Sequence, residues 1–247
     1  MKFLFLVFFA LSVQASADFA SDAQTVLNPP FKNEVFVPPG FDDLDDIEIT
    51  YVNHSTSSCF LRTYAFVPDI DHKNKTIKIS NVSLVLKSDF CRSRNTSSPT
   101  TLKIGSLEPG DYQLQFETEE GKYTPYSKIN VSKSKTEQKD DYEYAPLDVN
   151  GLTVKVDIKS KNIVLNLPGS FPNGCYAFKE IKVLDERSET VIEVLPVVDM
   201  VTSICTQEIQ FFNKEVKIPY NVSQRTKKLI HIRAADGVAI NRVVTLE

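Results

Sequence analysis

The sequence predicts an all-β fold class: two tandem β-sandwich domains, each with one intradomain disulfide. Three observations lead to this prediction. Apolar and polar residues alternate with a period of two in many short segments, the helical period is nearly absent, and two pairs of cysteines recur in similar surroundings. Period-two alternation is typical of a strand with one buried and one exposed face. Sheets built from such strands bury their apolar faces against each other in pairs.

The expected strands are short and are separated by clusters of Asp, Asn, Ser, Pro and Gly, which favour turns. The candidates in the first half are 34–37, 47–52, 59–67, 76–86, 101–104, 111–116 and 126–131. Those in the second half are 152–158, 162–167, 175–184, 190–198, 215–219, 228–233 and 239–246. Each half therefore has enough strands to build a two-sheet core of its own.

The two halves repeat each other around the cysteines. Cys59 and Cys91 are 32 positions apart, and Cys175 and Cys205 are 30 positions apart. In each pair the first Cys opens an alternating strand, a charged turn follows, and a second alternating strand leads to the second Cys. Two copies offset by about 115 residues indicate a duplication. Four cysteines permit three pairings, and the repeat favours Cys59–Cys91 and Cys175–Cys205.

The repeat and the local composition suggest the domain boundaries. We expect the first sandwich at 31–132 and the second at 148–247. The intervening segment 133–147 is polar and lacks apolar periodicity, so it is expected to be a linker that leaves some freedom between the domains. Residues 18–30 are expected to be a flexible leader before the first strand.

A short motif carries a family resemblance. The segment Leu107-Glu108-Pro109-Gly110-Asp111-Tyr112 resembles the L-x-P-G-x-Y start of a late strand in immunoglobulin-like and fibronectin type III-like domains. The resemblance implies that Tyr112 packs its ring as a tyrosine corner and bonds its hydroxyl to nearby backbone. The second half departs from the motif at 223–228, and the chain contains no Trp, so antibody domains are a poorer match. The stretch 37–43 is similar to exported bacterial β-proteins without an assigned activity.

The N-terminus predicts export. Lys2 precedes an apolar run over 3–13, which is shorter than the roughly 20 residues of a membrane span. The sequence at 14–17 then offers a small-x-small cleavage pattern, so residues 1–17 are expected to be a signal peptide. We expect a periplasmic or extracellular protein without a membrane span. The short signal favours a bacterial source. Six Asn-x-Ser/Thr sequons would be glycan sites in a eukaryotic secretory pathway, and this point stays open.

Residue patterns that carry catalysis or nucleic-acid binding are scarce. The formal net charge is −4 with both signs interspersed, whereas a nucleic-acid binder shows a basic stripe. His54 and His72 lie in polar turns and His231 in an alternating strand. Zinc-protease, serine-hydrolase and phosphate-loop motifs are missing from the sequence. We therefore expect no catalytic or cofactor-binding residues and a protein that is not an enzyme.

An acidic segment is the candidate metal site. Five carboxylates lie within seven residues, at Asp42, Asp43, Asp45, Asp46 and Glu48. Carboxylate oxygens are the ligands that calcium prefers, so calcium is the one cofactor that the sequence suggests. The alternative is a solvated acidic loop that discourages edge-to-edge pairing of strands.

Aromatic residues near the expected linker are candidates for a binding face. Tyr123, Tyr126, Tyr142 and Tyr144 gather there, and Phe211 with Phe212 follows the second cysteine pair. Tyrosine is typical of contact surfaces, while ordinary core and inter-domain packing is the alternative.

We expect an exported, non-enzymatic binding or adhesion module whose loops contact a protein or glycan partner. A structural or accessory subunit of an envelope or surface assembly, joined through edge strands, is the alternative function. An enzyme or enzyme inhibitor is the third.

Overall fold

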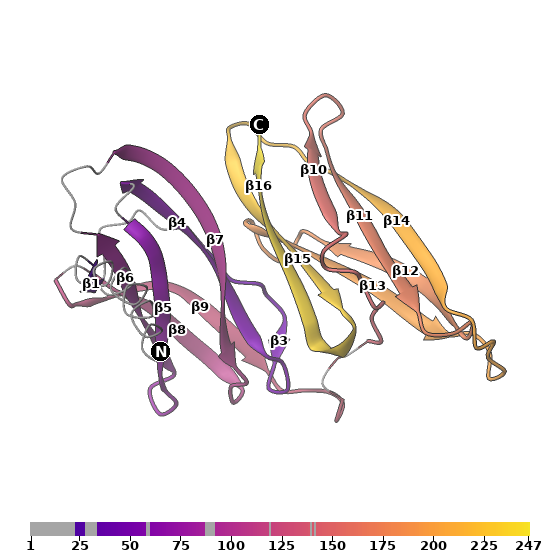
Figure 1. The fold of residues 1–247 in the computed structure, drawn as a ribbon. Helices are drawn as coiled ribbons and strands as arrows, with labels where there is room; N and C mark the ends of the chain where they lie inside the picture. The colour runs from indigo at the N-terminus through magenta and orange to yellow at the C-terminus, as the bar shows by residue number, and fades with distance from the viewer. Residues whose placement is uncertain are drawn as a thin grey trace, which may run out of the picture.

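The computed structural model describes residues 23–27, 34–57, 60–86, 92–118, 120–138, 140 and 142–247. Over these residues it is all-β with one 3-10 turn at Ala235–Gly237, which confirms the predicted all-β class. Two bodies lie side by side, the first indigo to magenta and the second orange to yellow (Figure 1). No helix among the described residues is long and apolar enough to cross a membrane.

The first body consists of two sheets. One sheet has the strand order β1-β6-β8-β9-β3, with β5 also paired to β6, and the other has the order β2-β4-β7. The strands are β1 Ala23–Leu27, β2 Glu34–Phe36, β3 Phe41–Asp42, β4 Ile47–Ser57, β5 Phe60–Asp71, β6 Thr76–Leu86, β7 Ser93–Gly105, β8 Gly110–Glu117 and β9 Tyr123–Ser132. Alternate residues of β4 and β6, including Ile47, Ile49, Ile77 and Ile79, are fully buried. The two sheets therefore enclose one core.

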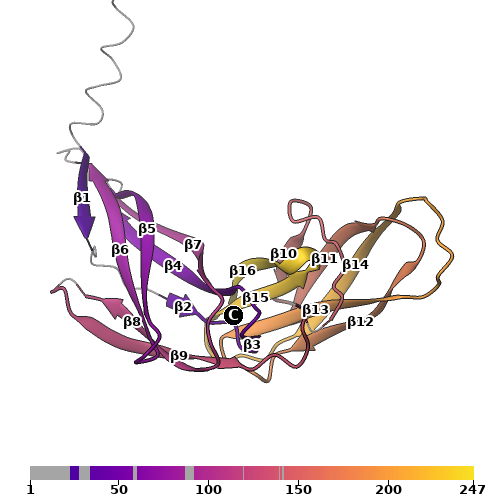
Figure 2. The ribbon, with the colours of Figure 1, turned by 90° about the horizontal axis from the view of Figure 1, so that it is seen from below.

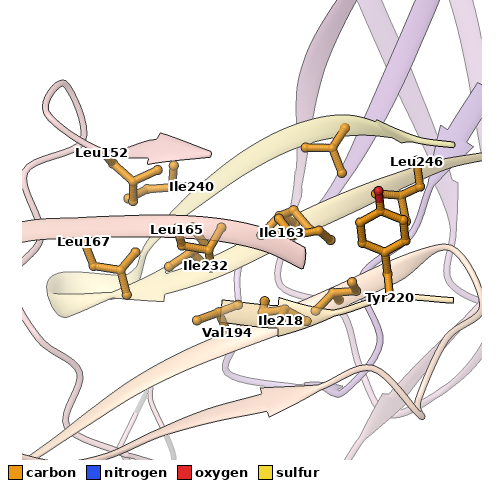
Figure 3. Packing of buried hydrophobic residues seen from close by; sticks show 13 residues of the cluster. Leu152, Ile163, Leu165, Leu167, Val194, Ile218, Tyr220, Ile232, Ile240 and Leu246 are labelled. Atoms are coloured by element: carbon orange, nitrogen blue, oxygen red, sulfur yellow. The ribbon is translucent and has the colours of Figure 1, made fainter. Parts of the chain in front are cut away.

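The second body also consists of two sheets, with orders β10-β11-β14 and β12-β13-β15-β16. The strands are β10 Thr153–Asp157, β11 Asn162–Phe171, β12 Tyr176–Leu184, β13 Val191–Met200, β14 Gln210–Pro219, β15 Thr226–Ala234 and β16 Val238–Leu246. Ile163, Leu165 and Leu167 of β11 face Ile232 and Ile240 across the core (Figure 3). The period-two pattern of β11 thus places its apolar side chains inside, as the sequence predicts.

The two bodies share one topology. In the first, β5-β6 is antiparallel, β6-β8 parallel and β8-β9 antiparallel. In the second, β12-β13, β13-β15 and β15-β16 repeat that order. The sheets β2-β4-β7 and β10-β11-β14 correspond in the same way, which supports the predicted duplication. The parallel pair in each body departs from the antiparallel sheets of immunoglobulin-like domains, so the fold that the two bodies share is a β-sandwich.

The predicted disulfides have different outcomes. Cys175 and Cys205 are bonded, with their Cα atoms 4.9 Å apart, which confirms this pair. Cys59 and Cys91 lie outside the described residues, so their pairing stays a prediction. In the chain they stand just before β5 and β7, as Cys175 and Cys205 stand before β12 and β14.

Three expectations at the edges of the first body change. Residues 1–17 lie outside the described chain, but part of the expected leader forms β1, whose Ala23 pairs with Leu86 of β6. Strand β7 starts at Ser93, well before the expected 101, because the Ser- and Thr-rich stretch pairs with β4. The ring of Tyr112 is fully buried as expected. Its hydroxyl, however, accepts a hydrogen bond from Lys75 Nζ at 3.1 Å.

Candidate binding cleft

The acidic segment lies where the two sandwiches meet. Asp45 Oδ1 accepts a hydrogen bond from Arg233 Nη2 of β15 at 2.6 Å. Glu48 Oε1 accepts one from Asn241 Nδ2 of β16 at 2.5 Å. Both carboxylates are buried, with exposed fractions of 7% and 5%. The segment therefore joins the first sandwich to the second.

Two other acidic residues of the segment accept hydrogen bonds from backbone N–H groups. Asp42 Oδ1 accepts the Leu44 N–H at 2.9 Å, and Asp43 Oδ1 accepts the Ser134 N–H at 2.7 Å. That backbone hydrogen bond lowers the pKa of Asp43. Within the described chain, no group of three or more His, Cys, Asp or Glu side chains is placed to hold a metal ion. Calcium binding by Asp42, Asp43, Asp45, Asp46 and Glu48 stays a prediction.

A buried polar network continues from these carboxylates into the second sandwich. His231 of β15 is 1% exposed, and its Nδ1 lies 2.9 Å from Asn241 Oδ1 and 3.6 Å from Glu48 Oε1. Burial lowers the pKa of His231. Burial also disfavours the charge of Arg233, but the ion pairs with Asp45 and Asp140 outweigh it and raise the pKa of Arg233. The histidine is thus held neutral next to a permanent cation.

An apolar patch completes the contact between the sandwiches. Phe36 and Val52 of the first sandwich form one cluster with Val191 and Leu229 of the second. At the margin, Lys227 Nζ donates to Glu34 Oε2 at 2.6 Å. We call this surface, with the network around Arg233, the junction.

Close packing at the junction also explains a glycine. Gly40 has a φ of +82°, a conformation that L side chains rarely adopt, and an added Cβ there would lie 3.0 Å from Arg187 Nη1. Both the backbone conformation and the space therefore favour glycine at this position.

The expected linker divides into two parts. Residues 143–148 form hydrogen bonds with β11 and β13, among them Ala145 N–H to Pro196 O at 2.9 Å and Asp148 N–H to Pro168 O at 2.8 Å. Ala145 O accepts the Ala235 N–H at 3.2 Å. These backbone groups extend the sheets of the second sandwich, and the domain start at 148 stays a prediction.

Beside this segment lies a cleft of about 800 Å³, which we call the tyrosine cleft. Its aromatic lining comes from Tyr142 and Tyr144 of the connecting segment and from Phe171 and Tyr176 of the second sandwich. Tyr142 is 41% exposed, whereas Tyr144 and Phe171 are buried. Tyr142 therefore offers its ring to a ligand over a firm aromatic floor.

Two cations hold the tyrosine rings in place. Lys182 Nζ lies 4.1 Å from the centroid of the Tyr142 ring, and the Arg233 guanidinium lies 5.8 Å from that of Tyr144. Beneath the cleft, Phe171 contacts Phe212 and Phe178, with ring centroids 4.8 and 5.4 Å away. Such cation–π and edge contacts orient rings, so the binding face is preformed.

The polar lining of the tyrosine cleft is acidic. Glu143 and Asp236 are exposed at its wall, while Asp140 accepts a hydrogen bond from Arg233 at 2.7 Å. Exposed carboxylates accept hydrogen bonds from hydroxyl or amine donors. The cleft therefore suits a ligand with a flat apolar face and several donors.

The structure separates the aromatic residues that the sequence grouped. Tyr142 and Tyr144 line the cleft, and Phe212 packs below it. Tyr126 instead stacks edge-on against Phe116 in the first sandwich, with centroids 5.6 Å apart. Tyr123 of β9 also lies in the first sandwich, where Lys78 of β6 sits over its ring. No local pattern in the sequence singles out Arg233, because its partner Asp45 lies 188 residues away along the chain.

A family model described as an ORF11 beta-sandwich domain matches residues 165–226, which run from within β11 to the first residue of β15. No curated protein and no solved structure matches the chain. The observed sheets and this partial match define the protein as a β-sandwich protein. The match covers about a quarter of the chain, within the second sandwich.

Proposed function

We propose that the protein is an exported, non-enzymatic binding or adhesion module that holds a protein or glycan partner in the tyrosine cleft. The observation that carries the proposal is the preformed cleft itself, with Tyr142 exposed above a buried aromatic floor. Its volume of about 800 Å³ falls among those of ligand-binding clefts.

The chemistry of the cleft defines the expected ligand. An aromatic face packs on the C–H face of a sugar ring or on a proline side chain, and Glu143 and Asp236 accept hydrogen bonds from hydroxyls or amines. The nearby cations are engaged, Lys182 with Tyr142 and Arg233 with two aspartates. A ligand rich in donors is therefore favoured over an anion.

Export is part of the same proposal. The apolar N-terminal run and its small-x-small pattern support it, and so does the Cys175–Cys205 disulfide. Disulfides persist in oxidising compartments, which is where an adhesion module meets its partner.

Charge on an edge strand favours the binding module over an assembly subunit. Strand β12 ends its sheet and carries Lys179, Glu180 and Lys182. Charged residues on an edge discourage strand-to-strand association. A surface assembly built through β12 would have to cover these charges.

The proposal is tested with arrayed glycans and arrayed extracellular proteins probed with the purified chain. Tyr142→Ala and Asp236→Asn should each weaken binding of the best ligand at least about tenfold, the scale of one lost contact. Tyr123→Ala, an exposed tyrosine outside the cleft, serves as the matched control and should bind as the parent chain does. Unchanged binding by the two cleft variants would reject the cleft. A stable oligomer on size exclusion that needs β12 would favour the assembly alternative.

A further inference from the structure

The loop between β13 and β14 exposes apolar side chains at the end of the second sandwich. Met200, Val201, Ile204, Ile209 and Phe211 are 59, 62, 86, 55 and 85% exposed. We call these five residues the apolar tip. The loop lies at the end of the molecule farthest from the first sandwich, where it projects beyond the strands in both views (Figures 1 and 2).

The backbone of this loop is fixed, so the exposure is built into the fold. Cys205 is bonded to the buried Cys175, whose carbonyl accepts the Val201 N–H at 2.8 Å. The Gly174 N–H donates to Thr206 O at 3.2 Å. An added Cβ on Gly174 would lie 2.3 Å from Thr206 Oγ1, so the Thr206 side chain packs directly against Gly174. The disulfide thus holds the apolar side chains outward in water.

The loop that carries the apolar tip has almost no net charge of its own. Glu208 is the one charged residue over 200–213. At the base of the loop, Lys179 Nζ and Asp199 Oδ2 form an ion pair at 3.1 Å, and each neutralises the other. The remaining polar residues of the loop are Thr, Ser, Gln and Asn. This surface can leave water without stripping solvent from an unpaired cation.

The composition of the tip favours lipid over a protein partner. Strong contacts between proteins rely on Trp, Tyr and Arg, whereas Val, Ser and Thr are under-represented there. The tip offers Ile, Val, Met and Phe among Ser and Thr, and no Trp, Tyr or Arg lies over 200–213. A projecting apolar loop also fits the disordered interior of a lipid layer without a complementary groove.

We propose that the apolar tip inserts shallowly into the surface of a lipid bilayer and anchors the protein peripherally. Insertion to the boundary between headgroups and acyl chains, about 5–10 Å deep, covers Ile204 and Phe211 and leaves the Lys179–Asp199 pair at the headgroup level. Because the tip is nearly neutral, zwitterionic lipid suffices. The tyrosine cleft borders the tip, because Ile209 lines both surfaces. Ile204 and Phe211 do not line the cleft, so the insertion of these two residues does not depend on the proposed function.

The test is co-sedimentation of the full, disulfide-intact chain with vesicles of phosphatidylcholine alone or mixed with phosphatidylserine. The chain should bind both kinds of vesicle equally at low and high salt. Ile204→Ser and Phe211→Ser should each weaken binding about tenfold, the effect of withdrawing one large apolar side chain from lipid. The matched control is Ile158→Ser, which changes an isoleucine that is 57% exposed in the β10–β11 turn, and it should bind as the parent does.

Four outcomes would overturn the proposal. The parent chain does not sediment with any vesicle, or Ile158→Ser weakens binding as much as Ile204→Ser does. Binding confined to phosphatidylserine and abolished by salt would show electrostatic adsorption. A dimer in sedimentation velocity that Ile204→Ser dissociates, without vesicle binding, would assign the tip to a second copy. Circular dichroism of each variant checks that the fold is retained.

Discussion

The junction and the apolar tip both depart from the usual pattern of apolar residues inside and charged residues outside, in opposite ways. The junction buries ionisable groups, Asp45, Glu48 and His231 among them, whereas the tip exposes Ile204 and Phe211 to water. Buried charges are costly unless each finds a partner, and the junction supplies partners from both sandwiches. Exposed apolar residues are unfavourable for a different reason, because contiguous apolar surface in water favours association with a partner, a membrane or another copy. The junction connects the two sandwiches to each other, whereas the apolar tip is a surface for contact with another molecule or a membrane.

The two regions also differ in what fixes them. Charge-assisted hydrogen bonds across a long sequence separation hold the junction, as in the Arg233–Asp45 pair. A disulfide and short-range backbone hydrogen bonds hold the loop of the tip.

Removing the guanidinium should break the junction. Arg233→Met leaves Asp45 and Asp140 without their partner in a place where the arginine is only 14% exposed. An uncompensated buried charge costs about 3–5 kcal/mol of unfolding free energy, measured by urea denaturation. Lys217→Ala removes a surface pair with Glu215 and should change stability by about 0.5 kcal/mol or less. If the two variants lose equal stability, the buried ion pair of Arg233 contributes no more to stability than a surface ion pair.

A double substitution separates the pairing from the loss of a large side chain. Adding Asp45→Asn to Arg233→Met removes one of the two stranded carboxylates. The combined variant should be less destabilised than the sum of the two single changes, because the partners are coupled. Strict additivity would show that the two groups act independently.

Opening the disulfide should loosen the second sandwich. Replacing both Cys175 and Cys205 with Ser frees a loop closed over 30 residues, and the chain-entropy account gives a loss of about 3–4 kcal/mol. Thermal and urea unfolding of the oxidised parent and the double variant measure this loss. An unchanged midpoint would mean that the backbone hydrogen bonds alone fix the loop. Mass spectrometry without reduction would also show whether Cys59 pairs with Cys91.

Acid should weaken the junction through His231. Burial lowers the pKa of His231 below the ordinary 6.5, so below about pH 6.5 the unfolded chain takes up a proton that the folded chain refuses. Stability is therefore fully present above that pH and falls as the pH drops toward the folded pKa. Glu193 acts in the opposite direction at lower pH, because burial raises its pKa above 4.5 and the folded chain binds that proton first.

A histidine variant isolates this contribution. His231→Gln keeps a side chain that can hydrogen-bond Asn241 and Glu48 but has no proton to titrate. Between about pH 7.5 and 5.5 its unfolding midpoint should change less than that of the parent, because the imidazole contribution is gone. Parallel pH profiles for the two proteins would assign the acid sensitivity to other groups.

How much of this the sequence could predict depends on the range of each interaction. Local alternation predicted the buried face of β11, and the cysteine repeat predicted the Cys175–Cys205 bond. Strand β7 was placed too late because its Ser- and Thr-rich start resembles a loop, and only its pairing with β4 makes it a strand. Strand β1 was missed for a similar reason, since its five residues form a strand by pairing with the edge of β6.

The site was harder to predict than the fold. The acidic segment stood out as a metal-site candidate because its carboxylates are adjacent in the chain. The partners of Asp45 and Glu48 lie 188 and 193 residues away, and no local pattern links them. Likewise, the sequence does not distinguish Tyr142 from Tyr126. Only the tertiary fold places Tyr142 in the cleft and Tyr126 against Phe116 of the first sandwich. Alternation places Phe211 and Phe212 on opposite faces of their strand. It does not show that Phe211 is the one that faces water and Phe212 the one that packs against a core.

The smallest expected effect on stability belongs to the apolar tip. Ile204 is 86% exposed, so Ile204→Ser removes almost no buried surface and should shift the unfolding free energy by about 0.5 kcal/mol or less. Leu165→Ala, in the core of the same sandwich, should cost about 2–5 kcal/mol. Urea unfolding of both variants against the parent measures the difference. A large loss for Ile204→Ser would mean that the tip packs within the chain, which would remove the contrast with the junction and the reason to seek a lipid cover. A small loss together with weaker vesicle binding would assign Ile204 to a contact outside the molecule.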